Sequence, residues 1–313
     1  MRVLLFSIAA SAVLIAAPAA NQVRLTSSAN VTLRRLPKAD APAVGQVPLG
    51  TELVDVGPPG LDKTWLHVRL PDSREGWITA ALTRSAVPSE RWRVVLSIGR
   101  DRVARQGDGF AALAELTDFL ERESDQPDTG IRAQIEVLHM QALSKAAAAI
   151  PIRRDHLEPF SSWIAGHQSL VVYDEPGGHW MVAPKAIWDR HDALATTPSA
   201  DALAWMAVTN GLPGECAGQA ACYLAALNQL EGEYLRKHPL GPHALEAVTS
   251  IADTTDRLTD ASKPHETIQF DRAADCSSLT ASIDALRSTV SVTNVPNRDA
   301  AIQGLSAMRS WCK

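Results

Sequence analysis

Hydrophobic and polar residues change their spacing along this chain between residues 84 and 89. Before that point, from residue 23 to residue 85, apolar side chains form short runs separated by proline, glycine, aspartate and serine. Such runs are typical of strands that reverse direction at tight turns. The pattern predicts strands over residues 31–33, 44–47, 52–56, 65–70 and 76–79. We therefore expect a small all-β barrel over residues 23–85.

From residue 89 onward the apolar positions repeat with the spacing of helices. Ser89 can cap a first helix that ends near Gly107, and Pro151 stands where a third helix, ending near Ile150, must stop. Other stripes predict helices over residues 110–120, 184–195, 199–209, 219–238, 241–259, 276–288 and 298–311. No fixed repeat period recurs, so we expect an α-helical hairpin domain over residues 89–313 and not a repeat array.

One segment within the helical part has strand character. Residues 170–173 and 180–182 are apolar runs separated by the turn-forming residues 174–179, which predicts a small β-hairpin. An isolated hairpin is marginally stable, so it must pack against another element. We expect a structural lid; the alternative is a second ligand-facing feature that carries Tyr173 and Trp180.

The composition is that of an ordinary globular protein. The 313 residues are 46% hydrophobic and 21% charged, which argues against disordered, collagen-like and polytopic membrane classes and suits two domains. With 30 Lys and Arg against 35 Asp and Glu, the formal net charge is −5. No basic surplus points to a nucleic-acid partner, so none is expected.

The N-terminal residues have the features of a signal peptide. Arg2 supplies a positive charge, residues 3–17 are apolar, and Ala17-Pro18-Ala19 is the small-x-small pattern that precedes a cleavage site. We expect removal of residues 1–19 on export, most simply to the periplasm, and no stable membrane insertion of the mature chain. An uncleaved membrane anchor is the alternative, because about 18 apolar residues can just span a bilayer.

The expected export of the chain decides how its four cysteines are interpreted. An oxidising environment makes pairing the rule, and four cysteines allow three connectivities. Cys216 and Cys222 flank a flexible stretch that can close a small loop, whereas Cys276 and Cys312 lie at opposite ends of an expected helical hairpin. Because the ends of an antiparallel pair meet, we favour the disulfides Cys216–Cys222 and Cys276–Cys312 over the other two connectivities.

Five stretches of the strand-rich segment follow one another in a recognisable order. They are Asn30-Val31-Thr32-Leu33-Arg34-Arg35, Val44-Gly45-Gln46-Val47, Leu49-Gly50-Thr51-Glu52-Leu53, Trp65-Leu66-His67-Val68 and Glu75-Gly76-Trp77-Ile78. Their order and chemistry resemble the bacterial SH3 domain, SH3b, over residues 23–85. The chain departs from that family at Leu36, where the family usually has glycine.

The resemblance implies a small SH3-like barrel used for targeting or ligand capture in cell envelopes, at peptidoglycan or at another protein, and it implies no fixed site residues. From the residues themselves we select Arg34 and Arg35, whose guanidinium groups can bind carboxylates of peptide stems through paired hydrogen bonds. The alternative is that both are solvated surface charges. Trp65 and Trp77 complete the candidate set, although we expect their rings to pack in the barrel core.

The motifs of known reaction classes are incomplete. Cys276 resembles the nucleophile of NlpC-type cysteine endopeptidases, but the base of that family follows the cysteine, and the last histidine here is His265. His167, His179 and His191 lack the i,i+4 spacing that aims two imidazoles at one metal ion. We expect no catalytic residue, no metal and no cofactor. A carboxylate pair for glycoside cleavage stays open, because its partners can be distant in sequence.

The expected fold is multidomain, with an N-terminal all-β SH3-like barrel followed by a mostly α-helical hairpin domain that contains one small β-hairpin. The expected function is that of a non-catalytic exported cell-envelope protein whose SH3b-like domain binds peptidoglycan or a protein partner. Two alternatives come from other classes. One is a helical protein-interaction scaffold with the barrel as an accessory, and the other is a cell-wall hydrolase with an unrecognised site.

Overall fold

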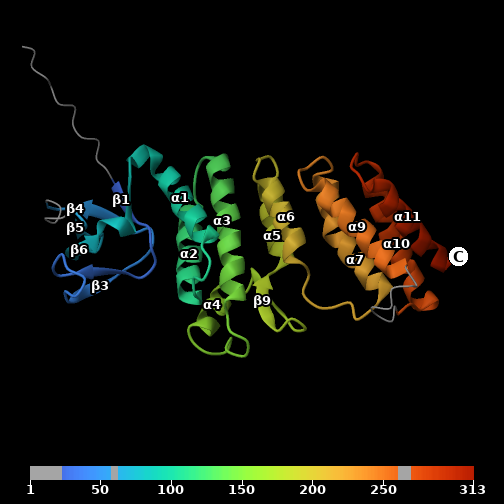
Figure 1. Cartoon of the computed structure of the whole chain (residues 1–313), viewed down its shortest axis with the longest axis horizontal. Coiled ribbons are helices and arrows are strands. Elements are labelled where there is room, and N and C mark those ends of the chain that lie inside the picture. Colours follow the sequence, from blue (N-terminus) through green and yellow to red (C-terminus); the bar gives the residue numbers. More distant parts are fainter. Residues whose placement is uncertain (1–22, 58–62, 260–268) are drawn as a thin grey trace, which may run out of the picture. The chain divides into compact units, whose positions relative to one another are not determined.

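A computed structural model describes three stretches of the chain, residues 23–57, 63–259 and 269–313. These stretches form two compact units that divide between Val94 and Val95, inside the first helix. Figure 1 shows strands in the N-terminal unit and mainly helices in the second. The expected signal peptide, residues 1–19, lies outside the described residues.

The N-terminal unit is a seven-stranded antiparallel sheet. Its strands are β1 (Val23–Thr26), β2 (Val31–Arg34), β3 (Ala43–Val47), β4 (Glu52–Asp55), β5 (Trp65–Arg69), β6 (Glu75–Thr79) and β7 (Thr83–Ala86). Their order across the sheet is β3-β2-β6-β5-β4-β1-β7. Within the described residues no pairing joins the edge strands β3 and β7, so the sheet is not closed between them.

Side chains alternate between the two faces of each strand. On one face the aliphatic side chains of neighbouring strands form the core of the unit: Val31, Leu33, Val47, Leu53, Val68, Leu70 and Ile78. Gly76 is buried among them, and a Cβ there would lie 2.7 Å from the carbonyl oxygen of Arg34 and 2.8 Å from Cγ of Leu33. The absence of a side chain at Gly76 therefore lets β6 approach β2 closely.

All five strands predicted from the pattern are present, with boundaries shifted by one residue at most. The pattern does not predict β1 and β7 as strands. Residues 83–86 of β7 are mostly polar, and the strand exists because it pairs with β1 over four residues, from Val23 opposite Ala86 to Thr26 opposite Thr83. Such pairing joins residues that are distant in the sequence, so the local pattern of apolar and polar residues does not indicate the strand.

The second unit contains most of α1, all the later helices and one β-hairpin (Figure 1). The helices are α1 (Arg91–Ala104), α2 (Phe110–Glu123), α3 (Thr129–Ala148), α4 (Phe160–Gly166), α5 (Pro184–Ala193), α6 (Ala200–Asn210), α7 (Ala220–Gln229), α8 (Glu231–Lys237), α9 (Ala244–Thr259), α10 (Arg272–Ser291) and α11 (Arg298–Arg309). Among the described residues, none of these helices is both long enough and apolar enough to span a bilayer.

The helices differ from the pattern in several places. Helix α4 has no predicted counterpart, and α10 begins at Arg272, four residues before the predicted start. Ser89 does not cap α1 directly, because it lies in a short 3-10 helix, Pro88–Glu90, that precedes it. The single helix predicted over residues 219–238 is two helices, α7 and α8, which meet at Leu230, whose backbone is not helical. A break of this kind lets one apolar stripe turn toward a second neighbour.

The predicted β-hairpin is present. Its strands are β8 (Val171–Asp174) and β9 (His179–Val182), which pair in antiparallel register. Val182 is fully buried and β9 packs against α3, so the hairpin belongs to the core of the helical unit. Tyr173 remains partly exposed and its ring lies 5.5 Å from that of Trp180.

Two of the hydrophobic cores that described residues form in the helical unit meet at α6. The first core includes buried side chains of α3, α5 and α6, and the second includes those of α7 to α11. Helix α6 contributes to both, because Leu203 and Ala207 lie in the first core and Ala204 lies in the second. The Trp188 indole packs partly against both cores. The interface between the cores therefore runs along α6 and the end of α5.

Both expected disulfides are present in the structure. Cys216 is bonded to Cys222 and Cys276 to Cys312. The second bond joins the start of α10 to the 3-10 helix Ser310–Cys312 that follows α11. It therefore closes the hairpin that α10 and α11 form at the C-terminus.

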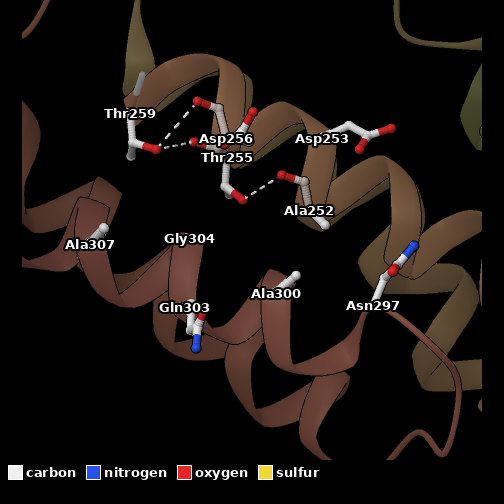
Figure 2. A pocket seen from close by; sticks show the side chains of 10 residues that line it. All are labelled: Ala252, Asp253, Thr255, Asp256, Thr259, Asn297, Ala300, Gln303, Gly304 and Ala307. Carbon is white, nitrogen blue, oxygen red and sulfur yellow. Dashed lines mark hydrogen bonds between the residues drawn. The ribbon is translucent and has the colours of Figure 1, made fainter. Parts of the chain in front are cut away.

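A groove between α9 and α11 results from small residues on both helices (Figure 2). Gly304 of α11 faces Thr255 of α9, and a Cβ on Gly304 would meet the Thr255 hydroxyl and lie 2.7 Å from its Cβ. The Thr255 hydroxyl donates a hydrogen bond to the carbonyl oxygen of Ile251 at 2.9 Å. Thr255 is fully buried, so it cannot move aside without disturbing the helix packing.

Gly304→Ala is expected to lower the free energy of unfolding by about 1–3 kcal/mol, because overpacking at this crossing outweighs the higher helix propensity of alanine. Chemical denaturation measures the change. Gly166→Ala in α4 is the matched control, since no atom lies within 4 Å of its added Cβ. Equal stability changes for the two variants would show that the α9–α11 contact tolerates a methyl group.

Replacing Cys276 and Cys312 together with serine is expected to destabilise the protein by about 3–4 kcal/mol, because the unfolded chain regains the freedom of the loop between them. The melting temperature of the double variant, measured without reductant, reports the loss. Replacing Cys216 and Cys222 with serine removes a disulfide that closes a smaller loop, so that double variant is expected to lose less stability. A larger loss for the smaller loop would contradict this account.

Candidate ligand-binding site

Four residues lie on the face of the N-terminal sheet that is opposite its core. We call them the aromatic face: Arg34, Trp65, His67 and Trp77. In β5, Val68 is buried and Leu66 packs against the core, so Trp65 and His67 project from the other face. In β6, buried Gly76 and Ile78 flank Trp77 in the same way. The two-residue period of the strands therefore brings these rings together.

His67 and Trp77 form the centre of this face. They are directly opposite in the β5–β6 register, and their rings stack with centroids 4.8 Å apart and planes at 17°. A Cβ on Gly57 would lie 3.1 Å from Nδ1 of His67, so the backbone of Gly57 lies close to the imidazole. The β5–β6 pairing holds the stacked rings on one side and the backbone of Gly57 holds them on the other. The two rings therefore form an ordered, half-buried aromatic surface.

Arg34 extends this surface across one more strand. It is opposite Trp77 in the β2–β6 register, and its Nη1 donates a 2.7 Å hydrogen bond to the carbonyl oxygen of Ala41. That bond fixes part of the guanidinium group. Arg35 follows the end of β2, is exposed, and donates its backbone N–H to Pro42. The structure thus groups Arg34 with the rings, whereas Arg35 lies beyond the strand.

The expectation that Trp65 and Trp77 pack in the barrel core is wrong. Both are half-buried, and the core of the unit consists of aliphatic side chains. The reason is strand parity: residues 66, 68, 76 and 78 occupy the inner face, so their odd-numbered neighbours must face outward. The aromatic rings are therefore available on a surface that the core does not require.

His67 belongs to the aromatic face but was not among the candidate residues predicted from the sequence. Its signal was present, because alternation in the run Trp65-Leu66-His67 places the histidine on the same side as the tryptophan. Beyond it on the same face, Arg69 and Glu75 form an ion pair at 2.6 Å across the β5–β6 register. Both groups are about half exposed, so the pair adds little stability, but it places a second guanidinium group along the row.

The residues that matched enzyme motifs occupy separate places. Cys276 offers no thiolate while its disulfide with Cys312 is intact. His167 contacts the carbonyl oxygen of Trp163 through Nδ1 at 2.8 Å, and Nδ1 of His179 lies 3.7 Å from Asp174. Within the part of the chain that the structure describes, no three His, Cys, Asp or Glu side chains converge as metal ligands.

Glu231 at the start of α8 is a buried carboxyl group. Its Oε1 accepts a 2.7 Å hydrogen bond from the Ser250 hydroxyl, while Oε2 is buried without a hydrogen-bond partner among the described residues. Burial raises the pKa of Glu231, and the bond from Ser250 opposes that shift in part. Raised carboxyl pKa values occur at catalytic sites, but this group lies inside the helix packing and has no second carboxylate hydrogen-bonded to it.

Glu231→Gln is expected to gain stability relative to the wild type as pH rises from 4 to 7. The folded-state pKa is raised, so the wild type is stabilised by this group at low pH and loses that contribution as pH rises through the folded pKa. Glutamine does not titrate, so the variant has no corresponding loss of stability as the pH rises. Denaturation at pH 4 and pH 7 gives the two differences, and the exposed Glu175→Gln is the control. A difference that shrinks with pH would contradict the assignment.

Comparisons with known proteins identify no relative of this chain. No protein-family model, no curated protein and no solved structure matches it. The functional argument therefore depends on the geometry of the chain itself.

Proposed function

We propose that this is a non-catalytic, exported cell-envelope protein whose N-terminal unit is an SH3b-like barrel that binds peptidoglycan, with a protein partner as the alternative ligand. The observation that carries the proposal is the aromatic face. Arg34, Trp77 and His67 lie in register across three adjacent strands. None of the three belongs to the core.

The chemistry of the face suits a polymer of sugars and acidic peptides. Stacked, half-buried rings supply a flat apolar contact at low entropic cost, because aromatic side chains have few rotatable bonds. Guanidinium groups at the edge of the rings bind carboxylates through paired, charge-assisted hydrogen bonds. Arg35, although outside the ring row, adds an exposed guanidinium group next to the half-buried Arg34.

Two further features support export. The structure contains two disulfides and the described cysteines are all paired, which is typical of proteins that fold in oxidising compartments such as the periplasm. The first residues of the chain have the pattern of a signal peptide. The proposal places the mature chain outside the cytoplasm, where peptidoglycan is accessible.

The test is co-sedimentation of the purified mature chain with peptidoglycan sacculi at several salt concentrations. The double variant Arg34→Ala with Arg35→Ala is expected to bind about tenfold more weakly and with a flatter salt dependence, because charge-assisted bonds to carboxylates are lost. Its melting temperature is expected to fall only slightly, because Arg34→Ala removes one hydrogen bond to the Ala41 carbonyl oxygen and Arg35 is exposed.

The matched control is Arg153→Ala with Arg154→Ala, an exposed arginine pair in the helical unit that removes the same charge. It is expected to bind like the wild type. Equal weakening by both double variants would mean that net charge alone drives binding. Unchanged binding by the Arg34 and Arg35 variant would favour the helical scaffold, and release of soluble muropeptides by the wild type would favour the hydrolase.

A further inference from the structure

Two histidines meet at the interface between the two cores of the helical unit. The Nε2 atoms of His191, in the last turn of α5, and of His238, just after α8, lie 2.9 Å apart. Side-chain exposure is 3% for His191 and 18% for His238, so water is largely excluded from the contact. At this distance one nitrogen must donate a proton and the other must accept it.

The neighbouring groups decide which nitrogen accepts. Nδ1 of His191 lies 2.7 Å from Oδ1 of Asp192, and the same oxygen accepts a 2.7 Å bond from the Lys237 ammonium group. Hydrogen bonds from Lys237 and then His191 lower the pKa of Asp192, so this carboxylate is ionised and accepts only. Nδ1 of His191 therefore carries a proton, and in the neutral ring its Nε2 accepts from Nε2–H of His238.

Charged and titratable groups face the pair from each element packed against it. Helix α5 supplies Asp192 and α6 supplies Asp201, whose carboxylate lies 3.7 Å from Nδ1 of His238. Helix α8 supplies Lys237 and Tyr234, and the Tyr234 hydroxyl donates a 2.7 Å bond to Asp201. The backbone N–H of His243 in turn donates to the Tyr234 oxygen at 3.1 Å.

The number of protons that the contact can hold is limited by this arrangement. One added proton can occupy Nδ1 of His238, where Asp201 faces it, and the bond between the two Nε2 atoms persists. A second added proton must occupy Nε2 of His191, which would put two N–H groups against each other at 2.9 Å. The closed contact therefore takes up at most one proton, whereas two separated histidines take up two.

We propose that His191 and His238 form a proton-binding junction that holds the end of α5 to the end of α8 at neutral pH and loosens in acid. The junction joins an element of the first core to an element of the second. Among the described residues, the Lys237 bond to Asp192 and the Lys237 ammonium group 5.9 Å above the Trp188 ring also join the two elements here, and Trp188 packs against both cores. Opening would separate the two ends without unfolding either core.

The direction of the pH effect follows from proton binding. Burial lowers the pKa of His238, with His191 and Lys237 adding to that effect and Asp201 opposing it. A lowered histidine pKa in the closed state means that the junction is most stable above pH 6.5 and weakens as pH falls below it. The two histidines of the open junction can bind two protons, whereas the closed pair binds at most one. This difference raises the ratio of open to closed junction at least about tenfold as the pH falls from 7.5 to 5.5.

The test compares the wild type with a double variant, His191→Gln with His238→Gln, whose side-chain amides can donate and accept hydrogen bonds but do not titrate. Melting temperatures are measured at pH 7.5 and pH 5.5. The wild type is expected to lose clearly more stability than the double variant on going to pH 5.5. The control, His156→Gln with His179→Gln, removes one exposed and one half-exposed histidine outside the junction and is expected to lose as much as the wild type.

Hydrogen exchange of the wild type locates the effect. After correction for the intrinsic pH dependence of exchange, amides at the C-terminal ends of α5 and α8 are expected to lose protection at pH 5.5, while those in the middle of α3 keep it. Equal melting losses in the wild type and the glutamine variant, or a uniform loss of protection, would overturn the proposal.

An imidazole titration followed by NMR keeps the proposal testable if the glutamine variant does not fold. Burial lowers the pKa of His238, so its imidazole is expected to become protonated only below the usual histidine range. Titration of His238 at or above pH 6.5 in the folded protein would overturn the proposal. A zinc titration of the wild type separates proton from metal: a rise in melting temperature that the glutamine variant lacks would assign the pair to a metal and also overturn the proposal.

Discussion

The two-residue period of a β-strand is the constraint on which the N-terminal unit depends. Once Val68 and Ile78 are buried in the core, Trp65, His67 and Trp77 must point away from it, because successive side chains of a strand face opposite sides. The same alternation that builds a small aliphatic core therefore builds a row of rings and a guanidinium group on the solvent side. Core and candidate site are two consequences of one geometric rule, and a one-residue shift in register would exchange them.

Close approach of backbones has the corresponding role elsewhere. Gly76 lets β6 lie against β2, which places Trp77 opposite Arg34. Gly304 lets α11 lie against α9, which brings the C-terminal hairpin onto the second helical core. In both places the missing side chain defines the distance between elements, and the disulfide between Cys276 and Cys312 holds the far end of that hairpin.

Polar side chains inside the helical unit differ in how many hydrogen-bond partners they have. Tyr234, Asp201, His238, His191, Asp192 and Lys237 form a connected chain of contacts across the interface of the two cores. Glu231, by contrast, leaves one carboxylate oxygen without a hydrogen-bond partner among the described residues. A connected network specifies one arrangement of helices, and it also makes that arrangement sensitive to the number of protons it holds.

Local patterns in the sequence determined five of the seven strands of the first unit, most helices, the hairpin and the pairing of the cysteines, because each follows from spacing or from the meeting of helix ends. Tertiary structure decided the rest. Strand β7 exists through pairing with β1; Trp77 belongs to the surface because of its neighbours' burial; and His191 and His238, 47 residues apart in sequence, meet through helix packing. Contacts between distant residues depend on how elements pack, and no local periodicity encodes that.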